Sequence, residues 1–203
     1  MFLSKLERKL QEELPGLIAQ MLMAPEKRPF LAAPGKPVPA AVLILLFQRD
    51  EEWYTVFIKR NDYDGPHGGQ ISLPGGRMER YDSSLQETAL RETQEELGIP
   101  SGRIRILGNL TPLHIPASNY IVHPFVGKYT GIPSWQPDIA EVKYVIEARL
   151  SQLLDEKNVK FKKIFSGEHT WNAPFYDMNG EEIWGATAMI MSEFVEIIRS
   201  VEF

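Results

Sequence analysis

The stretches GGRMERYD (residues 75–82) and RETQEELGI (residues 91–99) say most about this chain. The first contains a glycine turn, and the second carries three carboxylates, Glu92, Glu95 and Glu96. Helical residues three and four positions apart share a face, so these side chains should point the same way. Like charges on one face repel each other unless cations lie between them, and Mg²⁺ prefers carboxylate oxygens. The pattern therefore predicts a metal-binding helix; the alternative is a solvated, glutamate-rich face.

Signals at both ends define this helix. Ser84 and Glu87 fit a capping box at its start, with Ser83 and Gln86 as a second option. Gly98 stands where a C-terminal cap is expected, so the helix should span residues 85–97. We expect the three glutamates on an exposed face and a packing face made of Leu85, Ala89, Leu90, Thr93 and Leu97.

These residues resemble the Nudix box, G-x5-E-x7-R-E-U-x-E-E-x-G-U, in which U is a bulky apolar residue. Its second half matches at 91–92, 95–96 and 98–99. Thr93 stands at the first U position, where it can pack through its methyl group. One extra residue between Gly76 and Arg91 leaves Asp82 nearest to the expected glutamate.

The segment before the box resembles that of the coenzyme A pyrophosphatases, where an Arg precedes the pattern R-x3-G-x3-F-P-G-G. Arg60 matches the first Arg and Gly69 matches the Gly. Leu73 replaces the Phe of the pattern, and Gly65 occupies the position of its second Arg. Asn61 replaces the usual small residue after the first Arg. The likeness covers roughly residues 38–200 and includes residues 115–120, 123–126, 138–142 and 183–188.

The rest of the chain reads as an arm followed by one domain. Ser4 and Glu7 fit a capping box, and leucines at 6, 10 and 14 predict a helix that Pro15 interrupts. We therefore expect a helical arm with a proline-rich linker over residues 1–37 and a hydrolase domain over residues 38–203. The arm packs on its own domain or on a second subunit, so a homodimer is considered.

Strands mixed with two main helices indicate an α/β or α+β fold, and the resemblance implies an α/β/α sandwich with a mixed sheet between helices. Expected strands are residues 41–48, 53–59, 71–73, 103–107, 121–129, 143–146, 159–164 and 173–176, with short and long helices near 149–154 and from 187.

The acidic helix suggests how a pyrophosphate could be hydrolysed. Metal ions polarise phosphoryl oxygens and lower the pKa of bound water, which here implies Mg²⁺ or Mn²⁺. Glu92 and Glu96, one turn apart, are the best pair of ligands, and Glu95 is a third ligand or the general base. The backbone carbonyl of Gly75 or Gly76 could add an oxygen, and we expect a positive φ at Gly76.

The resemblance adds roles for further residues. It implies that Arg91 pairs with Asp82 or Glu79 and holds the turn in shape; otherwise Arg91 is a surface residue. It also implies that Glu141 joins the metals or acts as base, against the alternative of an exposed glutamate before a strand.

Substrate contacts are expected from the strand end and the loop that precede the glycine turn. Arg60 suits a substrate phosphate, or is simply a charge at a strand end. His67, Gly69 and Gln70 are candidate substrate-binding residues, although a loop histidine is more often only exposed.

Composition limits the function. The net charge of −5 argues against nucleic-acid binding, and the absence of cysteine excludes disulfides and zinc thiolate sites. Charges alternate at the N-terminus and no apolar run could span a bilayer, so we expect a cytoplasmic protein with no membrane partner.

The expected reaction is metal-dependent hydrolysis of the pyrophosphate in a small nucleotide. Coenzyme A or acyl-coenzyme A would give 4′-phosphopantetheine and adenosine 3′,5′-bisphosphate. Alternatives are hydrolysis of ADP-ribose, dinucleotides or nucleoside triphosphates, and, from another class, a non-catalytic ligand sensor with this fold. All three glutamates of the box are retained, which disfavours the sensor.

Overall fold

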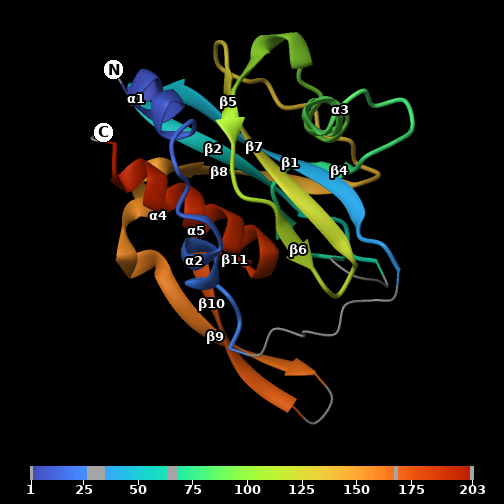
Figure 1. The fold of residues 1–203 in the computed structure, drawn as a ribbon, viewed down its shortest axis with the longest axis vertical. Coiled ribbons are helices and arrows are strands. Elements are labelled where there is room, and N and C mark those ends of the chain that lie inside the picture. Colours follow the sequence, from blue (N-terminus) through green and yellow to red (C-terminus); the bar gives the residue numbers. More distant parts are fainter. Residues whose placement is uncertain (1, 27–34, 64–67, 167–168, 202–203) are drawn as a thin grey trace.

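The computed structural model describes residues 2–26, 35–63, 68–166 and 169–201. Within these residues, an eight-stranded mixed sheet lies between α3 on one face and α5 on the other (Figure 1). The strand order is β3-β2-β1-β7-β5, with β4 paired to β1, β6 to β7 and β8 to β2. A second sheet has the order β11-β10-β9. This layering confirms the predicted sandwich with a mixed sheet.

The bounds of the elements are as follows. The helices are α1 (Phe2–Lys9), α2 (Gly16–Met21), α3 (Leu85–Leu97), α4 (Leu150–Leu154) and α5 (Gly185–Arg199), with 3₁₀ turns at Ser101–Arg103 and Glu156–Asn158. The strands are β1 (Val38–Arg49), β2 (Glu52–Arg60), β3 (Ile71–Ser72), β4 (Gly75–Arg77), β5 (Ile104–Asn109), β6 (Leu113–Ile115), β7 (Tyr120–Tyr129), β8 (Val142–Arg149), β9 (Val159–Ser166), β10 (His169–Met178) and β11 (Glu181–Trp184). The sequence did not predict β4, β6 or β11.

Strand β1 is the centre of the main sheet. It pairs antiparallel with β2 and β4 and parallel with β7. Successive strand residues point to opposite faces, so Leu43 and Leu45 pack on the side of α3, whereas Ile44 and Leu46 pack on the side of α5. Because both faces are covered, the strand reads as one continuous apolar run.

Helix α3 has the predicted ends. The Ser84 side chain caps it by accepting a hydrogen bond from the Glu87 amide at 3.2 Å. The Glu87 carboxylate accepts from the Ser83 amide at 2.6 Å. At the other end, Gly98 adopts a φ of 67° and its amide donates to the Gln94 carbonyl at 2.9 Å. These caps confirm residues 85–97 as a helix.

The N-terminal helices pack against α5. Helix α1 begins at Phe2, so Ser4 lies inside it and the capping box expected there is wrong. Phe2 is buried in the same core cluster as Leu6 and Leu10 and packs on the Trp53 ring at 5.4 Å, which explains the earlier start. None of the helices in the described ranges is long and apolar enough to cross a membrane.

A fully buried carboxylate ties α2 to α5. Glu193 of α5 is 0% exposed and accepts hydrogen bonds from the Gly16 amide at 3.1 Å and the Gln20 side chain at 2.8 Å. The Thr111 hydroxyl donates to it at 2.6 Å and the Thr111 amide at 3.2 Å. A buried charge is tolerated only when it is hydrogen-bonded in this way.

Candidate active site

Glu96 lies under the glycine turn and not on an exposed face as expected. It is 1% exposed because β4 folds over this part of α3. One carboxylate oxygen accepts from the Gly75 amide at 2.8 Å, and Arg60 Nη1 lies 3.3 Å from the other. Burial raises the pKa of Glu96 to about 8, the charges of Glu92 and Glu141 add to this, and Arg60 and the Gly75 amide oppose it.

Both glycines of the turn are required, for different reasons. Gly75 has a φ of 149°, and a Cβ there would lie 2.3 Å from the Ala41 carbonyl oxygen. The expectation of a positive φ at Gly76 is wrong, because the positive φ occurs at Gly75 instead. A Cβ on Gly76 would lie 2.5 Å from the carboxyl carbon of Glu92. Gly76 therefore provides space for a carboxylate against the backbone.

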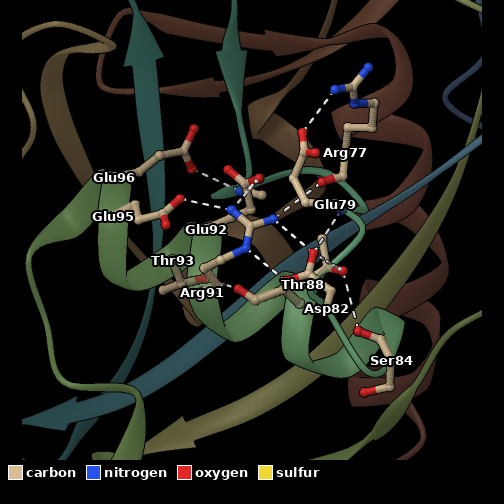
Figure 2. A network of polar contacts seen from close by, with 12 residues as sticks. Arg77, Glu79, Asp82, Ser84, Thr88, Arg91, Glu92, Thr93, Glu95 and Glu96 are labelled. Atoms are coloured by element: carbon tan, nitrogen blue, oxygen red, sulfur yellow. Dashed lines mark hydrogen bonds and ion pairs between the residues drawn. The ribbon is translucent and has the colours of Figure 1, made fainter.

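Arg91 organises the acidic face of α3 (Figure 2). Its Nε and Nη2 each lie 2.9 Å from an oxygen of Asp82. Its Nη1 lies 2.9 Å from Glu92 and 2.8 Å from Glu95, and Nη2 also donates to the Arg77 carbonyl at 3.2 Å. The guanidinium thus places a positive charge between Asp82, Glu92 and Glu95.

Asp82 is the partner of Arg91, which resolves the two options that the sequence left open. Asp82 is 7% exposed and also accepts from the Glu79 amide and the Thr88 hydroxyl, each at 2.9 Å. The hydrogen bonds from Arg91 hold the pKa of Asp82 well below its usual range, with the Glu79 amide and Thr88 contributing. The Glu79 carboxylate instead pairs with Arg77 at 2.8 Å.

The loop before β8 brings Glu141 to the same region. Burial raises the pKa of Glu92, and the negative charges of Glu95 and Glu141 raise it further. Asn61, next to Arg60, fixes this loop: its side chain donates to the carbonyls of residues 139 and 140, each at 2.9 Å. Its amide donates to the Glu141 carbonyl at 3.1 Å. Sequence reasoning recorded Asn61 only as a departure from a motif and missed this role.

A cavity of about 890 Å³ opens beside the glycine turn and is lined there by Arg60, Gln70, Gly75 and Gly76. Gly69 does not line it; its amide donates to the Asn61 carbonyl at 3.0 Å, and its φ is 64°. His67 lies outside the described residues. The structure therefore places two of the four candidate substrate residues, Arg60 and Gln70, in the cavity wall.

A NUDIX domain model matches residues 37–166 of the chain. The chain is a Nudix hydrolase. Nudix hydrolase NudL of Yersinia enterocolitica is 34% identical to it over 162 residues, which cover 79% of this chain and 81% of the relative. Mitochondrial coenzyme A diphosphatase NUDT8 of Mus musculus is 31% identical, with 77% and 76% of the two chains covered.

Solved structures agree with this Nudix fold. RenU, a Nudix hydrolase from M. smegmatis, aligns with a TM-score of 0.55 at 12% identity, covering 83% of this chain and 90% of the other. A MutT protein from Methanosarcina mazei aligns with a TM-score of 0.52 at 18% identity, covering 83% and 97%. As a member of this family, the protein hydrolyses pyrophosphate bonds in small nucleotide substrates.

Nudix hydrolases generally use divalent metals such as Mg²⁺, and the donor atoms of this Nudix site suit such an ion. In the part of the chain that the structure describes, no three acidic or histidine side chains converge as a ready-made cation site. Arginines hold the carboxylates instead: Arg91 binds Glu92 and Glu95, and Arg60 binds Glu96. Burial, with a smaller contribution from neighbouring carboxylates, raises the pKa of both Glu92 and Glu96, so a cation beside Gly76 would favour their charged forms. Oxygen donors with excess negative charge fit a hard divalent cation.

Proposed function

We propose that this Nudix hydrolase cleaves coenzyme A or acyl-coenzyme A in a Mg²⁺- or Mn²⁺-dependent reaction. The products would be 4′-phosphopantetheine and adenosine 3′,5′-bisphosphate. One observation carries the proposal: the Gly75–Gly76 turn touches Glu92 and Glu96 on one side and lines the large cavity on the other. The resemblance of residues 67–76 to coenzyme A pyrophosphatases and the 31% identity to a coenzyme A diphosphatase support the choice of substrate.

In this proposal, Glu92 and Glu96 bind the divalent ion, with Glu95 and the carbonyl of Gly76 as further oxygen donors. The bound ion supplies polarisation of the phosphoryl oxygens and a water of lowered pKa. Arg60, which lies 3.3 Å from Glu96, would be available to a substrate phosphate if Glu96 held the ion.

Arg91 is a positioning residue in this scheme. Its two bonds to Asp82 fix the guanidinium, and its bonds to Glu92 and Glu95 then fix the carboxylates.

Either Glu95 or Glu141 accepts the proton from the attacking water. Replacing each by glutamine separates the two, because only loss of the general base removes the acidic limb of the pH–rate profile.

The test is incubation of the purified protein with coenzyme A and Mg²⁺ or Mn²⁺, followed by mass spectrometry. We expect 4′-phosphopantetheine that requires the metal and disappears in Glu96→Gln. Glu79→Gln is the matched control, because Glu79 pairs only with Arg77 at the outer side of the turn among the described ion pairs. Intact coenzyme A under all conditions, or equal product from Glu96→Gln, would contradict the proposal.

Hydrolysis of ADP-ribose, a dinucleotide or a nucleoside triphosphate is the second candidate. It is favoured by Gly65, which occupies the position of the second arginine in the coenzyme A pattern. Comparison of kcat/KM for free coenzyme A and for ADP-ribose distinguishes the two. A higher kcat/KM for ADP-ribose would leave the metal-binding role of α3 in place but would make ADP-ribose, not coenzyme A, the proposed substrate.

A further inference from the structure

The part of the cavity away from the glycine turn is lined mainly by apolar side chains. Its opposite wall comes from the second sheet and α5, which lie on the other side of the main sheet from α3 (Figure 1). Ile164 of β9 and Trp171 of β10 line it, together with Trp184, Met189 and Ile190. These side chains offer a hydrocarbon surface and suit an apolar ligand group.

The register of the β9–β10 hairpin explains which residues reach the cavity. Ile164 and Trp171 are direct cross-strand partners, so their side chains lie on the same face of the hairpin. Phe165 follows Ile164 and points to the opposite face, where it is 74% exposed. The hairpin thus presents one apolar pair to the cavity, and Phe165 is a matched reference outside it.

Among the described residues, the cavity lining also includes buried polar atoms without a hydrogen-bond partner. Five buried side-chain polar atoms have no hydrogen-bond partner in the described parts of the chain, and three of them belong to cavity-lining residues: Arg60 Nε, Ser72 Oγ and Ser118 Oγ. Leaving such a group unpaired in a buried position is unfavourable. A ligand that carries phosphate or amide groups along part of its length would supply partners for these atoms.

We propose that the Ile164–Trp171 end of the cavity is an acyl subsite, which binds the hydrocarbon chain of an acyl-coenzyme A thioester. The kinds of group that line the cavity match the groups in such a substrate. Its pyrophosphate lies at the glycine turn, its pantetheine amides meet the serine hydroxyls, and its acyl chain meets the apolar pair. The inference rests on the proposed function for the identity of the thioester, and it makes the acylated form, not free coenzyme A, the preferred substrate.

The first test compares kcat/KM for octanoyl-coenzyme A with that for free coenzyme A. Each buried methylene contributes about fourfold to binding, so the wild-type ratio should be at least about ten. Ile164→Asp places a charge against the chain and should lower the ratio about tenfold or more, whereas Phe165→Asp should leave it at the wild-type value. A wild-type ratio near one, or equal ratios in the two variants, would overturn the subsite.

The second test does not depend on hydrolysis. S-octanoyl-pantetheine carries the acyl chain and the amides but no pyrophosphate, and its binding is measured by isothermal titration calorimetry. We expect binding to the wild type and to Phe165→Asp, and loss in Ile164→Asp and in Trp171→Ala, with thermal melts to confirm that the variants are folded. Trp171→Ala decides the question if Ile164→Asp does not fold. Binding without cleavage of any coenzyme A thioester would keep the subsite and remove the proposed function; cleavage of octanoyl-coenzyme A without this binding preference would do the reverse.

Discussion

Replacement of Asp82 by alanine should destabilise the protein far more than replacement of Glu79, although both acids lie in the same turn. Asp82→Ala removes both bonds to Arg91 at 2.9 Å and leaves the Glu79 amide and the Thr88 hydroxyl without their acceptor. Breaking a buried ion pair costs about 3–5 kcal/mol. Arg91 keeps its contacts to two glutamates, which favours the lower end, about 3 kcal/mol.

For a chain of this size, that loss lowers the melting temperature by about 6–12 °C. Glu79→Ala removes only the bond to the exposed Arg77 and should cost less than about 1 kcal/mol. Urea and thermal unfolding of the two variants and the wild type measure the difference. Equal unfolding midpoints for Asp82→Ala and Glu79→Ala would refute the assignment of Asp82 as the structural partner.

The direction of the Asp82 pKa shift determines how the stability contributed by the Asp82–Arg91 pair depends on pH. The pKa of Asp82 is lowered by folding, so its contribution to stability is present above the ordinary aspartate pKa and is lost as the pH falls toward the folded value. The difference in unfolding free energy between wild type and Asp82→Asn should therefore be constant near neutrality and shrink below about pH 4.

Three further predictions concern the metal helix and its surroundings. Glu96→Gln should lower kcat about a hundredfold or more. Because folding raises the pKa of Glu96 to about 8, the unfolding free energy of the metal-free wild type should fall as the pH rises from about 4.5 toward 8. Urea titrations of Glu96→Gln should not show this fall. Gly76→Val should reduce kcat/KM about tenfold or more because its side chain collides with Glu92, whereas Gly102→Val, where a Cβ meets nothing within 4 Å, should behave as wild type in the same assay. Asn61→Ala should release the loop before β8, lowering kcat about tenfold with less than about 1 kcal/mol lost in urea unfolding; unchanged kcat would show that the loop does not act in the reaction.

The elements found from sequence are those with signals of their own. The caps at Ser84 and Gly98 fixed the ends of α3, and an uninterrupted apolar run located β1. Strand β4 was missed because it contains two glycines and is extended only through its pairing with β1. Strands of two to four residues are too short for a periodic pattern, so their existence depends on partners that are remote in the sequence.

The site was predicted in composition but not in geometry. Helical spacing grouped Glu92, Glu95 and Glu96, yet it could not show that Glu96 is the one of these three that is fully buried, beneath β4. Likewise, the motif narrowed the partner of Arg91 to two acids, and only the path of the turn selects Asp82. Contacts between segments that are distant along the chain decide burial and pairing, and a single sequence does not record them.

The ties between the N-terminal helices and α5 have a consequence for synthesis. Residues 2–21 are synthesised more than 160 residues before Gly185–Arg199, the helix against which they pack. At roughly 5–20 residues per second, the arm waits on the order of ten seconds or more with its apolar face unpaired. During this interval the nascent chain displays Leu6 and Leu10 to any chaperone at the exit tunnel. Helices α1 and α2 therefore reach their final contacts only after α5 has been made.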